Sequence, residues 1–207
     1  MTQTTPNPYH HGDLDAALVK AATKLLEERG PASFSLREVA RAVGVSHAAP
    51  YRHFPSRQAL LESVAIGGFQ DLSDALDTVI QQYSDDPRQQ MIGAGATYVL
   101  EAINHPNRAQ LMLGSVLPQE SQTAKMQAAA EASFSRCVTV IQQGQQQGVF
   151  RQDSTRAMVL TYWAASHGLA MLLIANRLGD LAGGDNAETL WNLVAENLLA
   201  GFLTEPH

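Results

Sequence analysis

Apolar residues recur at spacings of three and four along most of this 207-residue chain, which is the pattern of helices that bury one face. The first such stretch covers residues 12–29 and is stopped by Gly30-Pro31. A long helix is predicted over residues 56–83, where Asp85-Asp86-Pro87 ends it. No run alternates in the way that is typical of a strand, so the pattern predicts an all-α fold.

The remaining helices follow the same spacing and are separated by proline, glycine or polar segments. They are predicted over residues 87–104, 107–116, 118–147, 154–178 and 186–203, so that the whole chain would hold about nine helices. We interpret the chain as three parts: a flexible arm over 1–11, a compact helical unit over 12–64 and a larger helical body over 65–207.

Two short helices joined by a tight turn are predicted between Ser35 and Phe54. Ser35 and Glu38 stand three residues apart, as in a capping box, so the first helix begins near Ser35. Gly44 ends it, because glycine reaches positive φ without steric cost. Ser46 can cap the second helix, which ends where proline follows Phe54. This layout is typical of a helix-turn-helix.

The second helix exposes polar, aromatic and basic side chains and no carboxylate, a face that suits a polyanion. These side chains are Ser46, His47, Ala48, Tyr51, Arg52 and His53. Spacing alone leaves open a helical hairpin whose face is simply solvated.

Charge is unevenly divided along the chain. Residues 1–60 hold seven Lys and Arg and five Asp and Glu, a net charge of +2, whereas residues 61–207 hold seven and fifteen, a net charge of −8. A basic head on an acidic body is expected of a protein that binds nucleic acid at one end. The weak basicity argues against a protein that coats DNA.

Residues 9–64 resemble the DNA-binding domain of the tetracycline-repressor (TetR) family of bacterial regulators. The resemblance is carried by a leading amphipathic helix, the turn Gly44-Val45-Ser46, the signature Tyr51-Arg52-His53-Phe54 and the basic Arg57. It implies that the helix over 46–54 lies in the major groove, where base edges carry a distinguishable pattern. His47, Ala48 and Arg52 would then contact bases, beside Ser46 on the same face.

The resemblance also implies which residues hold the DNA backbone. Tyr51 and His53 would bind phosphates, as would Arg57 at a helix N-terminus that favours anions. Two departures from the family pattern concern this role. Asp15 stands where many relatives carry a basic residue, and Arg57 replaces the commoner lysine, which keeps the charge but changes its geometry. Phe54 is interpreted as a core residue.

A shorter resemblance lies in the body, where Trp163, His167 and Gly168 are similar to a Trp…His-Gly element in the C-terminal domain of one TetR subgroup. Trp163 and His167 are four residues apart and therefore share a helix face. Gly168 would permit close helix contact. Packing against another helix and direct ligand contact both remain open for this element.

The family implies an effector pocket in the body and a two-fold dimer that matches a palindromic operator. Candidate pocket residues are Tyr98, Met112, Phe134, Trp163, His167 and Met171, each of which also suits an ordinary core. Candidate dimer residues on the last two helices are Leu160, Ala164, Leu172, Trp191 and Leu198. Few charges fall near the pocket candidates, which favours an uncharged or weakly polar effector of unknown identity.

Gly67-Gly68 lies in the middle of the long helix over 56–83, where each glycine costs about 1 kcal/mol relative to alanine. Two interpretations remain open. The glycines either allow a neighbouring helix to approach closely or form a hinge between the head and the body.

Several functions are disfavoured by what the sequence lacks. It has no metalloprotease, di-iron, nucleophile-elbow or phosphate-loop motif, so we expect no enzyme activity, no cofactor and no metal site. Cys137 is the single cysteine, and no run nears the roughly 18 apolar residues of a membrane span. No export signal is visible, so a cytoplasmic protein without a membrane partner is expected.

The sequence therefore predicts a ligand-responsive repressor that binds double-stranded DNA as a homodimer and is released by a small-molecule effector. An activator or an effector-independent DNA-binding regulator is the alternative. A helical carrier of small molecules, or an enzyme with an incidental helix-turn-helix, is a more distant one.

Overall fold

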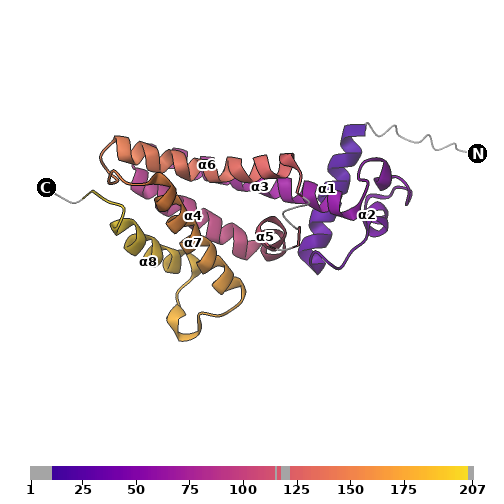
Figure 1. Ribbon diagram of the computed structural model, residues 1–207. Helices are drawn as coiled ribbons and strands as arrows, with labels where there is room; N and C mark the ends of the chain where they lie inside the picture. Colours follow the sequence, from indigo (N-terminus) through magenta and orange to yellow (C-terminus); the bar gives the residue numbers. More distant parts are fainter. Residues whose placement is uncertain (1–10, 115, 118–121, 205–207) are drawn as a thin grey trace, which may run out of the picture.

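The computed structural model describes residues 11–114, 116–117 and 122–204, with side chains from Leu14 onward. This part of the chain contains eight α-helices and no β-strand. They are α1 (His11–Arg29), α2 (Leu36–Val43), α3 (Arg57–Gln82), α4 (Pro87–Asn104), α5 (Pro106–Leu113), α6 (Ala124–Gln146), α7 (Thr155–Ile174) and α8 (Ala187–Ala200). Figure 1 shows α1 and α2 at one end of an elongated molecule, and α3 with α6 running side by side along the body.

The fold and most predicted helix bounds are confirmed, and α3, α4 and α8 lie close to their predicted ranges. The arm over 1–10 and residues 118–121 of the predicted helix 118–147 lie outside the described residues. Ser35 and Glu38 form the predicted capping box: the Ser35 hydroxyl accepts from the Glu38 N–H, and the Glu38 carboxylate accepts from the Ser35 N–H. Gly44 ends α2 with φ at 80°, as predicted.

The predicted helix over 46–54 is wrong in type. The segment is a series of turns followed by a short 3-10 helix, Pro50–Arg52. Pro50 has no N–H to give to the Ser46 carbonyl, and its ring would clash with that carbonyl in an α-helix. The chain uses tighter bonds instead, in which the Ala49 N–H donates to Ser46 and the Arg52 N–H donates to Ala49. The count of α-helices is therefore eight in the described residues rather than nine.

The core is divided between the two ends of the molecule. One cluster joins α1, α2 and the first half of α3, with Leu111 and Met126 added from the body. A second cluster fills the space between α4, α6, α7 and α8 around Trp191. Because α3 continues from the first region into the second, the division at residues 64/65 remains an interpretation of where the parts meet.

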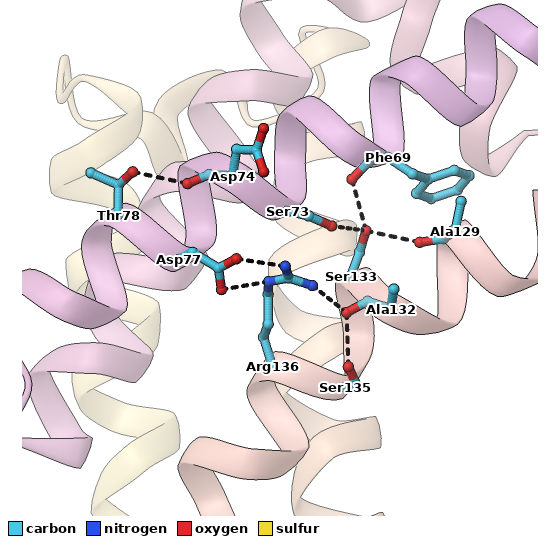
Figure 2. A network of polar contacts seen from close by, with 10 residues as sticks. All are labelled: Phe69, Ser73, Asp74, Asp77, Thr78, Ala129, Ala132, Ser133, Ser135 and Arg136. Atoms are coloured by element: carbon cyan, nitrogen blue, oxygen red, sulfur yellow. Dashed lines mark hydrogen bonds and ion pairs between the residues drawn. The ribbon is translucent and has the colours of Figure 1, made fainter.

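A polar clamp fixes α6 against α3 (Figure 2). The Arg136 guanidinium donates two hydrogen bonds to the Asp77 carboxylate, at 2.7 and 2.6 Å. This pairing holds the pKa of Asp77 below its usual range. Three residues before Arg136 on α6, the Ser133 hydroxyl donates to the Phe69 carbonyl at 3.0 Å and lies 2.9 Å from the Ser73 hydroxyl. These bonds set the register between the two helices.

Glycines mark where helices approach closely. A Cβ on Gly68 would lie 2.6 Å from the sulfur of Met112, so this glycine admits α5 against α3, while a Cβ on Gly67 would meet nothing within 4 Å. Gly95 is the tightest position, with the Trp191 ring 1.9 Å from a Cβ placed there. Gly168 was expected to serve close packing, but a Cβ there would also meet open space.

Helix α7 combines high hydropathy with low burial. Its mean hydropathy is 1.5 over an 18-residue window, of which 28% is buried, so by length and composition it could cross a membrane. The sequence predicted this helix over 154–178 but no membrane span, because Ser166 and His167 interrupt its apolar run. Its inner face packs against α4, α6 and α8, as core helices of globular proteins do. Its outer face leaves Leu160 and Leu172 exposed.

Candidate nucleic-acid interface and inner cavities

The turn between α2 and the 3-10 helix presents an exposed face at the tip of the head. Ser46, His47, Ala48 and Arg52 are exposed, and the Tyr51 ring is 53% exposed although it is one of the larger apolar side chains. Pro50 and Phe54 are buried and anchor the segment from behind. The face expected from the sequence therefore exists on turns rather than on an α-helix. Phe54 is a core residue, as predicted.

His53 does not share this exposure. Its side chain is 11% exposed, and its Nδ1 lies 2.5 Å from a carboxylate oxygen of Asp15 on α1. Asp15 is the residue that departs from the basic family pattern. The structure thus places the acid where it holds the imidazole, which corrects the expectation of an exposed His53 and fixes the turn against α1.

Arg57 is also drawn into the head. Its Nε donates to the Phe34 carbonyl at 2.7 Å, and its guanidinium carbon lies 5.1 Å from the centre of the Phe34 ring. One terminal nitrogen, Nη2, is buried without a hydrogen-bond partner among the described residues. Arg57 therefore ties the start of α3 to the loop between α1 and α2. Its role as a phosphate contact stays a prediction.

The dimer candidates fall into two groups. Leu160, Ala164 and Leu172 are exposed along the outer face of α7, where a partner could cover them. Leu198 is half-buried against the core. Trp191 is fully buried, and its indole N–H donates to the Ile92 carbonyl at 2.7 Å. The prediction that Trp191 lies at a subunit interface is therefore wrong, because the residue fills the centre of its own body.

Two small cavities lie between the helices of the body, each about 30 Å³ and partly open to the surface. The α5 cavity lies between α3, α4 and α5, and its border includes Gly68, Tyr98, Arg108 and Met112. The α7 cavity lies between α3, α4, α6 and α7, and its border includes Tyr98, Phe134, Tyr162 and Trp163. Leu72 and Tyr98 border both, so a single layer of side chains separates them.

The predicted pocket residues divide accordingly. Tyr98, Met112, Phe134 and Trp163 border one or both cavities. His167 borders neither, but its Nδ1 lies 2.8 Å from the Tyr98 hydroxyl. Met171 is partly buried against the core cluster around Trp191 and borders neither cavity, so its role as a pocket residue stays a prediction.

Sequence reasoning missed several residues around the cavities. Arg108 borders the α5 cavity and pairs with Asp71 at 2.7 Å and Glu101 at 3.2 Å. Ser133 and Tyr162 border the α7 cavity. Their positions depend on which helices pair in three dimensions, and no local motif marks them.

The groups around the α7 cavity are neutral. Burial raises the pKa of Tyr98 far above its usual range and the pKa of the Cys137 thiol to about 11. Burial also lowers the pKa of His167, so the imidazole that bonds Tyr98 is uncharged near pH 7. Among the described residues, no three His, Cys, Asp or Glu side chains gather as a metal site.

Known families match both parts of the chain. A model described as "Bacterial regulatory proteins, tetR family" matches residues 18–64, and one described as "Tetracyclin repressor-like, C-terminal domain" matches residues 91–198. This chain belongs to the TetR family. The first match contains the exposed turn and His53, the residue that Asp15 contacts. The second match contains Tyr98, Trp163 and His167. Members of this family are transcriptional regulators rather than enzymes.

Relatives and solved structures agree with this membership. The HTH-type transcriptional regulator Rv1816 of Mycobacterium tuberculosis is 32% identical over 110 residues, which is 51% of this chain and 45% of that protein. The chain thus matches less than half the length of this curated relative. A protein of unknown function from Rhodococcus sp. RHA1 is 30% identical over 96% of this chain and all of that one, with a TM-score of 0.85.

A third comparison shows the fold alone. The structure of FadR from Bacillus subtilis, described in complex with stearoyl-CoA, has a TM-score of 0.72 at 14% identity and covers 90% of this chain and 98% of that one. The family's body can therefore be shared by proteins with very different sequences. The Trp163, His167 and Gly168 element as a mark of one subgroup stays a prediction.

Proposed function

We propose that this protein is a transcriptional repressor that binds a palindromic operator as a homodimer and releases it when a small molecule enters the body. One observation carries the DNA-binding part of this proposal. The turn over 46–52 is exposed at the tip of the head, contains no carboxylate, and presents Tyr51 and Arg52 to solvent. Such a surface can approach phosphates without repulsion.

Within that turn, the roles divide by exposure. Tyr51 and Arg52 are placed to contact DNA directly, with His47 and Ala48 beside them. His53 and Arg57 support the turn from inside through Asp15 and Phe34. This support limits the loss of conformational entropy when the turn meets DNA.

The homodimer is favoured by α7. A helix with a mean hydropathy of 1.5 and 28% burial exposes more apolar surface than an isolated subunit usually tolerates. Leu160, Ala164 and Leu172 lie on that surface. A two-fold dimer through this face would present two heads to two half-sites. It would also bury the apolar helix in a protein of the cytoplasm.

The effector part of the proposal rests on the two inner cavities. They lie beside α3, the helix that also carries the head, so a ligand that widens them would bias the position of the head. Each holds only about 30 Å³ and must open to admit a ligand. A repressor is proposed over an activator because release by an effector needs only this loss of operator affinity.

The test is a mobility shift with duplex DNA from the region upstream of the encoding gene, at two salt concentrations. We expect a shift that weakens steeply with salt, since binding releases counterions from phosphates. Tyr51→Phe should weaken it on all sequences, and Tyr83→Phe at the far end of α3 should not. A shift unchanged by Tyr51→Phe would contradict the assigned contact, and no shift at any salt would contradict the function.

Repression is tested separately with a reporter placed behind the shifted DNA. We expect lower output when the protein is present. Higher output would favour the activator, and output that no cell-permeable small molecule changes would favour an effector-independent regulator.

A further inference from the structure

Nearly every polar atom around the α7 cavity is already hydrogen-bonded. The Tyr162 hydroxyl donates to the Met91 carbonyl at 2.7 Å, and the Ser166 hydroxyl donates to the Trp163 carbonyl at 3.1 Å. Ser133 is bonded to the Phe69 carbonyl in the clamp between α3 and α6 (Figure 2), and Tyr98 is bonded to His167. These groups can offer a ligand little without first breaking a bond within the protein.

Trp163 is the exception. Its Nε1 is buried and has no hydrogen-bond partner among the described residues. The other tryptophan, Trp191, is fully buried, yet its Nε1 donates to the Ile92 carbonyl at 2.7 Å. Buried donors are nearly always satisfied in folded proteins, so an unmet indole N–H at the edge of a cavity calls for an acceptor from outside the chain.

The position of the Trp163 ring makes this acceptor a ligand rather than bulk solvent. An open groove of about 510 Å³ lies outside α6 and α7, and Phe134, Val159 and Trp163 border both this groove and the α7 cavity. The Trp163 ring packs edge to face on Phe134, with centroids 4.9 Å apart. Nε1 is inaccessible to solvent and opens onto neither space as they stand, so an acceptor would reach it only when a ligand widens the α7 cavity that the ring borders.

The same surroundings argue against a charged ligand. The described groups that border the α7 cavity are apolar side chains, neutral hydroxyls, one thiol and the indole. Arg108 borders the neighbouring α5 cavity, but its charge is matched by Asp71 and Glu101. A carboxylate entering here would be desolvated without a free cation to pair with.

We propose that the indole N–H of Trp163 determines effector specificity, by donating to the single acceptor oxygen of a neutral, largely apolar ligand such as a ketone. The inference rests on the proposed function, since it names the chemistry of that effector. Phe134 supplies the ring that orients Trp163. A ligand lacking the oxygen would leave the N–H unmet and bind more weakly.

The test uses three matched probes and the full-length protein: 4-phenylbutan-2-one, butylbenzene and 4-phenylbutanoate. Affinities are measured by calorimetry, and the two indole N–H signals are followed in ¹H–¹⁵N spectra. We expect the ketone to bind about tenfold more tightly than the hydrocarbon, equal to about 1.4 kcal/mol, and the anion to bind least. The ketone should move the Trp163 signal downfield. The Trp191 signal serves as an internal control and should stay in place.

Trp163→Phe keeps a ring against Phe134 and removes the donor. In this variant the preference for ketone over hydrocarbon should fall to near one, with hydrocarbon affinity retained. The Trp191 signal in the variant reports whether the body has folded. If the variant does not fold, the wild-type spectra still test whether the ketone contacts Trp163. Equal binding of ketone and hydrocarbon, tightest binding of the anion, no binding of any probe, or a ketone complex that leaves the Trp163 signal unmoved would each overturn the proposal.

These outcomes are separable from those of the DNA experiment. A protein that shifts its upstream DNA but fails the ketone test keeps the proposed function and loses this inference. If the ketone moves only the Trp163 signal and the protein shifts no DNA, the cavity chemistry is retained and the proposed regulatory function is contradicted.

Discussion

The head and the body of this protein place their functional side chains in opposite environments. Tyr51 and Arg52 stand exposed on turns at the tip of the head. Tyr98 and Trp163 are partly buried among neutral groups beside a cavity of about 30 Å³. A surface that meets a polyanion can keep its charges in water until contact, whereas a surface that meets a small apolar molecule must be dry and neutral beforehand.

This difference indicates which substitutions should destabilise each region. The head should tolerate changes to its exposed residues without losing stability, because they contact little of the protein. The body should lose stability from a single methyl group added where two of its helices already touch, because no room is left at such a point. The predictions below test this contrast, beginning with the largest effect.

Gly95→Ala should destabilise the body by about 3 kcal/mol, the upper end for an overpacked core. The added Cβ would lie 1.9 Å from the rigid ring of Trp191. Gly168→Ala is the matched control in a neighbouring helix, where the Cβ meets nothing within 4 Å, and it should be neutral or stabilising by up to about 1 kcal/mol. Urea unfolding measures both. Similar stabilities for the two variants would show that the body repacks freely.

Arg52→Ala should weaken operator binding by about 1–3 kcal/mol while changing unfolding stability by less than about 0.5 kcal/mol. Arg52 is exposed in the head. Arg151→Ala, which removes an equally exposed arginine from the body, should leave DNA affinity unchanged. Mobility shifts and thermal unfolding are run on the same samples. Equal DNA affinity of the two variants would place the DNA-binding face elsewhere.

Asp77→Asn should cost about 0.2–1 kcal/mol at neutral pH, the range for a partly exposed ion pair. Arg136 lowers the pKa of Asp77 in the folded state, so the stabilisation is present above the unfolded value of 3.8 and is lost as pH falls through the lower folded value. Asp74→Asn makes the same charge change on the same helix without removing the bidentate bond. Unfolding curves between pH 7 and pH 2 should converge for wild type and Asp77→Asn, and a constant difference would exclude the linkage.

Local signals in the sequence predicted the start and end of α2 correctly but not the structure of the segment over 46–54. Ser35, Glu38 and Gly44 act through bonds to residues within a few positions, and the structure has them as predicted. The helix over 46–54 was inferred from a cap at Ser46 and a break after Phe54, and Pro50 between them prevented an α-helix by removing one N–H. The bond between Asp15 and His53 could not be foreseen, because it joins α1 to a turn that sequence periodicity does not place.

The body shows the opposite balance. Its helix ranges followed from periodicity, but the assignment of single residues to core, cavity or interface did not. Trp191 and Leu160 look alike in an apolar pattern, and only the facing glycine at 95 shows that Trp191 belongs inside. Tyr98, Phe134 and Trp163 were named from residue type alone, and what brings them together is the pairing of α4, α6 and α7.

Helix α3 carries a mechanical consequence for this arrangement. Its 26 residues run without a break from the exposed turn of the head along the body, a rigid rod of about 39 Å. A tilt of about 5° at one end of such a rod displaces the other by about 3.4 Å, which is the rise of one base pair. Movements at Tyr98 too small to alter the fold would therefore be amplified into a whole step along a DNA groove.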